Sequence, residues 1–329
     1  MENRKYQKIK RMKNNLHELR KTAAPWAGLV LLATLILLTA CGPAQLPTPP
    51  VSHELGKIVF AEDTYGGFYS YVPTTVSADT QLVALIHGTP AKEESAEETA
   101  HYYIVNWLEF AEKHDLILIV PAFNQEDFSS REGDHALGGY RGLLGRRIMA
   151  DEWLLRLIWA YQESFELSDK QFYLYGHSAG GQFTARFLVT HPEYVNQAVI
   201  SSAATYPQPT QEVAWPFGMG ALDANIEWDE NTVNHVNIVP DKQIWLDATQ
   251  VQLTVIVGLN DTSEIPPYPG QKGKNRFTIA RNWVQDMKSF AEENRLESRI
   301  AFEMIPGKGH SMSNLIPYCQ DALFTGQNP

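Results

Sequence analysis

One short motif in the sequence contains a serine that could act as a nucleophile. Residues 176–180 read Gly-His-Ser-Ala-Gly, with Ser178 at the centre. A strand-like run at 171–175 precedes the motif, and a helix-like run at 182–188 follows it. Small neighbours leave room for the strained turn that exposes a nucleophilic serine at the end of a strand. The motif therefore predicts that Ser178 is catalytic; the alternative is a glycine-rich loop that only connects two elements.

A serine hydroxyl needs a base to remove its proton and an acid to orient that base. Asp261 follows the strand-like run 251–257, and His310 follows the run 300–305 on a loop with two glycines. The chain order Ser, Asp, His is typical of a parallel sheet that carries such a triad. We expect His310 to be the base and Asp261 the acid. Glu264 is the alternative acid, and a turn-capping role is the alternative for Asp261.

An acyl-transfer site also needs N–H groups that stabilise the negative charge of a tetrahedral intermediate. One donor should be the backbone N–H of Ala179, directly after the nucleophile. The other should come from the loop after the third strand, residues 87–90, which reads His-Gly-Thr-Pro. Thr89 is the predicted donor, since Pro90 has no N–H and Gly88 lets the chain turn inward. A plain strand-to-helix turn is the alternative.

Strand-like and helix-like segments alternate after residue 55, which predicts an α/β fold with a mostly parallel sheet covered by helices on both faces. Helical spacing of apolar residues recurs around 104–111, 153–161 and 279–290, and Ser95 with Glu98 forms a capping-box pattern. The eight expected strands are 57–60, 68–72, 82–86, 116–120, 172–175, 198–200, 251–257 and 300–305.

Two long connections interrupt this alternation, at 124–145 and 207–249. Both follow strands whose carboxyl ends define the edge of the sheet where ligands bind. We expect them to form walls of a substrate cleft or, alternatively, plain surface loops. The tryptophans of the second connection suggest an apolar or aromatic substrate group, unless they pack as a small core of their own. Four of its acidic residues could be considered as metal ligands, but they show no diagnostic spacing; they are Asp223, Asp229, Glu230 and Asp241.

The amino-terminal segment resembles a bacterial lipoprotein signal. Eight Lys and Arg residues precede an uncharged apolar run at 28–40, and the run ends in Leu-Thr-Ala-Cys with Cys41 last. This resemblance implies cleavage before Cys41, its acylation, and attachment to a membrane on the periplasmic or cell-surface side. Residues 41–54 then form a proline-rich tether. The alternatives are an uncleaved signal anchor and, for Cys41, a small apolar helix residue.

The cysteine count and the net charge bear on disulfide formation and on nucleic-acid binding. Removal of Cys41 leaves Cys319 as the only cysteine, so no intramolecular disulfide is expected, and Cys319 should be a buried small hydrophobe. The chain of 329 residues has a formal net charge of −11, which argues against a nucleic-acid partner.

Ser178, Asp261, His310 and the His87-Gly88 pair together resemble the α/β-hydrolase superfamily over residues 55–325. The string 176–181 is similar to that of esterases in the polyhydroxybutyrate-depolymerase and feruloyl-esterase-like branches, although the chain lacks the three-glycine oxyanion motif of hormone-sensitive-lipase relatives. The resemblance implies cleavage of esters or amides through an acyl-enzyme, without a cofactor or metal.

The resulting hypothesis is a membrane-tethered serine esterase with a signal peptide at 1–40, a tether at 41–54 and a catalytic domain at 55–329. Its activity should fall as His310 becomes protonated. A peptidase or amidase with the same triad is one alternative. A non-catalytic surface binding protein of the same fold is the other.

Overall fold

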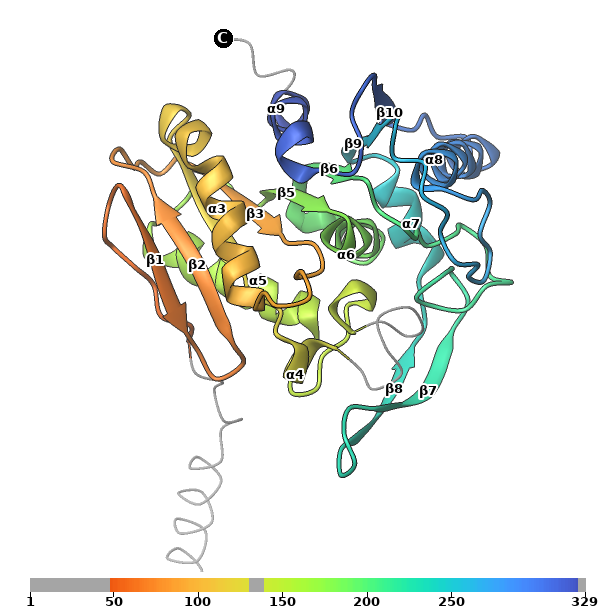
Figure 1. Cartoon of the computed structure of the whole chain (residues 1–329), viewed down its shortest axis with the longest axis horizontal. Coiled ribbons are helices and arrows are strands. Elements are labelled where there is room, and N and C mark those ends of the chain that lie inside the picture. The colour runs from red at the N-terminus through yellow and green to blue at the C-terminus, as the bar shows by residue number, and fades with distance from the viewer. Residues whose placement is uncertain (1–47, 130–138, 325–329) are drawn as a thin grey trace, which may run out of the picture. The chain divides into compact units, whose positions relative to one another are not determined.

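Eight strands form one sheet in the computed structural model, which describes residues 48–129 and 139–324 (Figure 1). Their order is β1-β2-β4-β3-β5-β6-β9-β10. Antiparallel pairing joins β1 to β2 and β2 to β4, while all other neighbours are parallel. The strands are β1 (Lys57–Glu62), β2 (Gly67–Val72), β3 (Gln81–Ile86), β4 (Leu116–Pro121), β5 (Phe172–His177), β6 (Val195–Ser201), β9 (Gln252–Gly258) and β10 (Ile300–Ile305). The predicted mostly parallel, eight-stranded sheet is confirmed.

Helices cover both faces of this sheet, which explains why the inner strands are apolar on both sides. Every residue of β4 and β5 is buried, whereas the edge strand β1 alternates between exposed and half-buried positions. Helices α3 (Ala96–Lys113) and α9 (Met312–Leu323) pack on one face. Helices α5 (Ala150–Ser164), α6 (Ala179–Leu188) and α8 (Arg276–Glu293) pack on the other. The α3 helix begins at the predicted capping box of Ser95 and Glu98.

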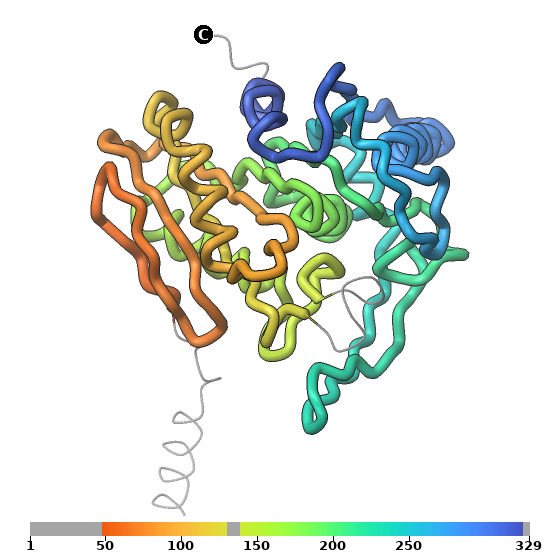
Figure 2. Tube along the Cα trace, in the orientation of Figure 1, coloured from red at the N-terminus to blue at the C-terminus, as the bar shows by residue number. Residues whose placement is uncertain are grey.

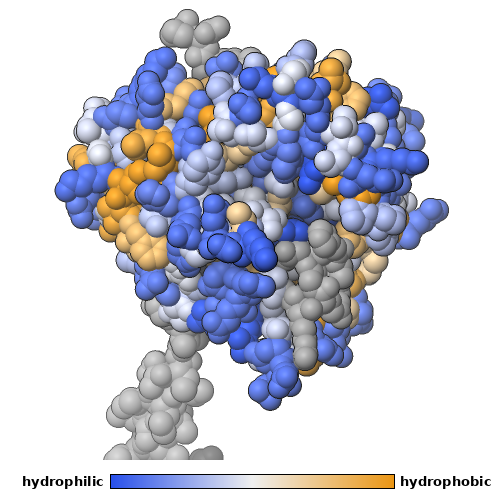
Figure 3. All heavy atoms as spheres, viewed as in Figure 1, coloured by the Kyte–Doolittle hydropathy of each residue, from blue (hydrophilic) through white to orange (hydrophobic). Residues whose placement is uncertain are grey.

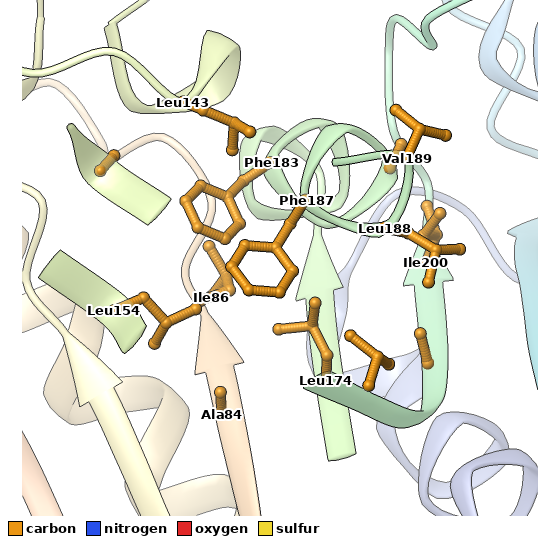
Figure 4. Packing of buried hydrophobic residues seen from close by; sticks show 14 of the residues in the cluster. Ala84, Ile86, Leu143, Leu154, Leu174, Phe183, Phe187, Leu188, Val189 and Ile200 are labelled. Carbon is orange, nitrogen blue, oxygen red and sulfur yellow. The ribbon is translucent and has the colours of Figure 1, made fainter. Parts of the chain in front are cut away.

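Helix α6 is the central helix of its layer, and core packing fixes its position (Figure 4). Phe183 and Phe187 are fully buried against the sheet, close to Ile86 of β3 and Leu174 of β5. Burial of one such side chain contributes about 1.5–3 kcal/mol. The amino-terminal end of α6, which directly follows Ser178, is therefore held by apolar packing several residues away.

Both long connections contain regular structure that the sequence analysis did not predict. The first includes α4 (Gln125–Phe128) and the 3₁₀ helix η1 (Gly139–Gly142). The second includes the antiparallel hairpin β7 (Leu222–Glu227) and β8 (Val233–Ile238), followed by α7 (Lys242–Ala248). Figure 2 shows this hairpin extending away from the main sheet. A short 3₁₀ helix, η2 (Pro192–Tyr194), precedes β6.

The tryptophans of the second connection are buried, Trp215 and Trp245 in the main core and Trp228 in a small separate cluster. Trp215, Trp228 and Trp245 are 1%, 7% and 0% exposed. Because these side chains are buried, they give no support to the expectation of an apolar or aromatic substrate group. They stabilise the connection instead.

The visible surface is largely hydrophilic, with apolar side chains gathered over β1, β2 and α3, where Phe60 and Val105 are exposed (Figure 3). Cys319 is a buried free thiol on α9, as expected, and its burial raises its pKa to about 12. Across the described ranges, every helix is too short or too polar to cross a membrane. Cys41 and residues 1–47 lie outside the described residues.

Candidate active site

Ser178 lies in a strained turn between β5 and α6. Its φ is 55° and its ψ is −112°, a conformation that costs a residue with a side chain about 1–3 kcal/mol. Two backbone hydrogen bonds hold the turn: the Ser178 N–H donates to the carbonyl of Ser201 at 2.8 Å, and the Gln182 N–H donates to the carbonyl of Ser178 at 3.1 Å. The hydroxyl thereby lies at the carboxyl end of the central strands.

Two glycines of the motif are required by close backbone contacts. A Cβ atom at Gly180 would lie 1.9 Å from the carbonyl oxygen of Ile86, and one at Gly176 would lie 2.2 Å from the carbonyl oxygen of Gly180. No side chain fits at such distances. The glycines allow β3, β5 and α6 to approach closely around Ser178.

The loops after β9 and β10 carry Asp261 and His310, and a backbone hydrogen bond ties these loops together. The Asn260 N–H donates to the carbonyl of Lys308 at 2.8 Å. Gly258 permits the contact, since a Cβ there would lie 2.4 Å from the Lys308 carbonyl oxygen. Asp261 and His310 are therefore positioned as one unit at the end of the sheet.

The structure brings Ser178, His310 and Asp261 into one hydrogen-bonded chain. The distance from Ser178 Oγ to His310 Nε2 is 3.1 Å, and that from His310 Nδ1 to Asp261 Oδ2 is 2.8 Å. Because a carboxylate only accepts, Nδ1 carries the hydrogen and Nε2 is free to accept the serine proton. Glu264, the alternative acid, is exposed and forms a backbone bridge with Asn275 instead.

Asp261 is 3% exposed and has a second hydrogen-bond partner, a charged side chain that the sequence did not predict. The Arg276 Nη1 donates to its Oδ1 at 3.3 Å, from the first residue of α8. Burial alone would raise the pKa of Asp261, but His310, Arg276 and the hydroxyl of Ser202 outweigh it, so the pKa is lowered. The carboxylate is therefore ionised while it orients His310.

His177 supports His310 from the end of β5. The two ring centroids are 4.9 Å apart, and His177 also hydrogen-bonds the backbone of His310. Its Nδ1 lies 3.1 Å from the hydroxyl of Ser201. Burial lowers the pKa of His177 to about 3, so this imidazole stays neutral and serves as a fixed structural contact.

The predicted oxyanion loop lies directly beside the nucleophile. A Cβ at Gly88 would be 3.5 Å from the Cβ of Ser178. The Gly88 N–H already donates to the hydroxyl of buried Tyr103 at 2.8 Å, so it is not available to a substrate. Thr89 is the next residue and is exposed, and Ala179 opens the first turn of α6, where N–H groups lack helical partners. This arrangement favours the N–H groups of Thr89 and Ala179 as donors.

Buried polar contacts fix the shape of that loop. The Phe123 N–H donates to His87 Nε2 at 3.0 Å, so His87 Nδ1 carries the hydrogen and donates to the Gly88 carbonyl at 2.6 Å. Burial lowers the pKa of His87 to about 4, which keeps the ring neutral. Arg141 Nη2 donates to the Thr89 hydroxyl at 2.6 Å. His87 and Arg141 thus hold the loop on both sides of Gly88.

A cavity of about 470 Å³ adjoins Thr89, a size typical of small-molecule sites. Phe123, Phe128 and Tyr140 contribute its aromatic lining, and Arg141 is among its polar residues. The first long connection therefore forms a wall of a hollow next to the loop 87–90, while its role as a wall of a substrate cleft stays a prediction. The second connection lines a different hollow, with residues 208–213.

Within residues 48–129 and 139–324, no group of three or more His, Cys, Asp or Glu side chains is placed to hold a metal ion. In the acidic part of the second connection, Asp229 pairs with Arg146 at 2.6 Å.

No protein-family model matches the sequence, and no curated protein sequence does so either. Solved structures do match. Poly(aspartic acid) hydrolase-1 from Sphingomonas sp. KT-1 superposes with a TM-score of 0.63 at 19% identity, over 82% of this chain and 98% of that one. A poly(3-hydroxybutyrate) depolymerase from Bordetella parapertussis gives a TM-score of 0.62 at 20% identity, over 80% and 85% of the two chains. The chain has the α/β-hydrolase fold. In this fold, the three triad positions occupy strand ends in the order found here.

Proposed function

We propose that this α/β-hydrolase-fold chain is a serine hydrolase that cleaves carboxylic esters through an acyl-enzyme. The observation that carries the proposal is the hydrogen-bonded chain from Ser178 through His310 to Asp261, beside the N–H groups of Ala179 and Thr89. Four loops that are distant in the sequence supply these groups, namely those after β3, β5, β9 and β10. A purely structural role would not require that they converge on a strained, half-buried serine.

Acylation follows from this geometry. The Ser178 oxygen attacks the ester carbonyl carbon while His310 Nε2 takes the hydroxyl proton. The carbonyl oxygen becomes an oxyanion, which the N–H groups of Ala179 and Thr89 stabilise. The bond to the alcohol oxygen then breaks, and the imidazolium gives its proton to the departing alcohol. Asp261 stabilises the transient imidazolium and remains ionised.

Deacylation repeats these steps with water as the nucleophile. His310 takes a proton from water as its oxygen attacks the acyl carbon, and the same N–H groups stabilise the second oxyanion. The acid leaves when the bond to Ser178 breaks and His310 returns its proton to the serine oxygen.

Intact-mass measurement with a fluorophosphonate tests the proposal without knowledge of the substrate. Purified protein that begins after Gly42 should gain one adduct, and the Ser178→Ala variant should gain none. Ser313→Ala is the matched control, since Ser313 is an exposed serine on α9, and it should label like wild type. A folded wild type that stays unlabelled would refute the hydrolase and favour the non-catalytic binding protein.

Ester and amide cleavage use the same catalytic groups, so the substrate class needs a second measurement. Two structural neighbours bear names of polymer-degrading enzymes, one for a polyamide and one for a polyester, which supports a screen that includes polymers of both kinds. The proposal predicts faster turnover of an ester than of the anilide of the same acid. Equal or faster cleavage of the anilide would favour the peptidase or amidase.

We further propose attachment to a bacterial membrane, on its extracytoplasmic side, through acylated Cys41. The support is the basic and apolar sequence before this residue and the proline-rich stretch after it. The Cys41→Ala variant should lose the lipid mass and leave the membrane fraction. Retention of the variant in that fraction would indicate an uncleaved anchor instead.

A further inference from the structure

The catalytic carboxylate is shared between a base and a permanent positive charge. Asp261 Oδ2 faces His310 and its Oδ1 faces the Arg276 guanidinium, at 2.8 and 3.3 Å. The side chain of Arg276 is 17% exposed, whereas that of Asp261 is 2% exposed. Solvent therefore screens this pair only partly. Arg276 does not touch the serine, so any influence on the reaction passes through Asp261 and His310.

Three elements place titratable groups around His310, two of them in contact with it and the third, Arg276, in contact with Asp261. Asp261 comes from the loop after β9, Arg276 from α8 and His177 from the end of β5. His177 is buried and neutral, so its contribution to the local charge is small. Asp261 favours the protonated form of His310, and Arg276 opposes that form because like charges repel.

We propose that Arg276 is a positioning residue that keeps His310 unprotonated, and hence Ser178 reactive, in mildly acidic solution. This inference rests on the proposed function. Without the guanidinium, Asp261 would act on His310 unopposed, and the base would be protonated at a higher pH. The acid limb of the pH–rate profile should therefore move upward when the positive charge is removed.

The rate of fluorophosphonate labelling between pH 5 and 9 measures this effect directly, since it requires the unprotonated base. Arg276→Gln retains a hydrogen-bond donor but removes the charge, and its acid limb should move up by about 0.5–1 pH unit. Arg276→Lys retains the charge and should keep the limb within about 0.2 unit of wild type. Arg281→Gln, an exposed position on the same helix, is the control for long-range charge and should also leave it unchanged.

The outcomes separate this inference from its alternatives. A limb that does not move in Arg276→Gln, with only a lower plateau rate, overturns the proposal and leaves Arg276 a purely structural partner of Asp261. An equal shift in Arg276→Lys also overturns it, because the charge would then be irrelevant. Wild type that fails to label at any pH refutes the proposed function itself. Thermal unfolding of each variant shows that the comparison is made on folded protein.

Discussion

Replacement of Asp261 by Asn should inactivate the protein by forcing the wrong tautomer on His310, and Arg276 determines this result. An amide has one acceptor oxygen and one donor NH2, whereas the carboxylate accepts on both sides. Arg276 only donates, so the amide oxygen must face it. The NH2 then faces His310 Nδ1, which must accept. The hydrogen moves to Nε2, and His310 can no longer take the proton of Ser178.

About ten- to hundredfold of the loss follows from the energies of the two amide orientations. The same substitution in a well-known Ser-His-Asp protease lowers kcat by about 10⁴-fold, or about 5.4 kcal/mol. Turning the amide around would restore the tautomer but would set NH2 against the guanidinium at a buried position. An unpaired buried donor costs about 1–3 kcal/mol, so the productive orientation is populated about ten- to hundredfold less.

Kinetics of the double variant test this reasoning. Gln at position 276 can accept as well as donate, so Asp261→Asn combined with Arg276→Gln should recover about ten- to hundredfold of kcat/KM relative to Asp261→Asn alone. The assay is hydrolysis of a chromogenic ester by wild type, both single variants and the double variant at pH 8. A double variant no more active than Asp261→Asn would refute the argument that Arg276 fixes the orientation of the amide.

Three further predictions concern the elements that hold the site. Gly180→Ala should prevent stable folding, because its Cβ would lie 1.9 Å from a carbonyl oxygen of β3. Gly309→Ala is the control: its Cβ would lie 4.0 Å from the nearest atom, the Asn260 carbonyl oxygen, so the thermal unfolding midpoint should not change. Tyr103→Phe leaves the buried Gly88 N–H without its hydrogen-bond acceptor. It should therefore lower the free energy of unfolding, measured in urea, by about 1–3 kcal/mol, and it should lower kcat more than it raises KM. Burial lowers the pKa of folded His87 to about 4, below its unfolded value of 6.5. The free energy of unfolding should therefore fall by about 3 kcal/mol as the pH drops from 6.5 to 4. A His87→Gln variant that unfolds with the same pH dependence as wild type would contradict this.

The sheet could be predicted because its inner strands are short apolar runs bounded by turns. Residues 116–120 read Leu-Ile-Leu-Ile-Val, a pattern that suits a strand covered on both faces. The β7–β8 hairpin carried a weaker signal. In β7, Leu222, Ala224 and Ile226 alternate with polar residues. Because the strand has only six residues and lies in a polar connection, this alternation of apolar and polar residues is a weak signal in the sequence.

The positions of Ser178, Asp261 and His310 could be predicted because each lies at or shortly after the end of a strand, and parallel strands bring their carboxyl ends to one edge. Arg276 has no such marker. It opens a helix that begins 15 residues after Asp261, and the path of the intervening chain depends on tertiary contacts, including the backbone bridge between Glu264 and Asn275. Local periodicity carries no information on such a path.

The negative net charge of the chain gives a physical reason for an arginine beside Asp261. A chain with a formal charge of −11 produces a negative potential at its surface, which favours protonation of any exposed imidazole. The His310 side chain is 40% exposed and therefore feels that potential. Salt weakens the long-range potential but acts little on a contact that excludes most of the solvent. The Arg276 guanidinium, held against buried Asp261, thus opposes protonation of His310 even when salt changes the potential from distant charges.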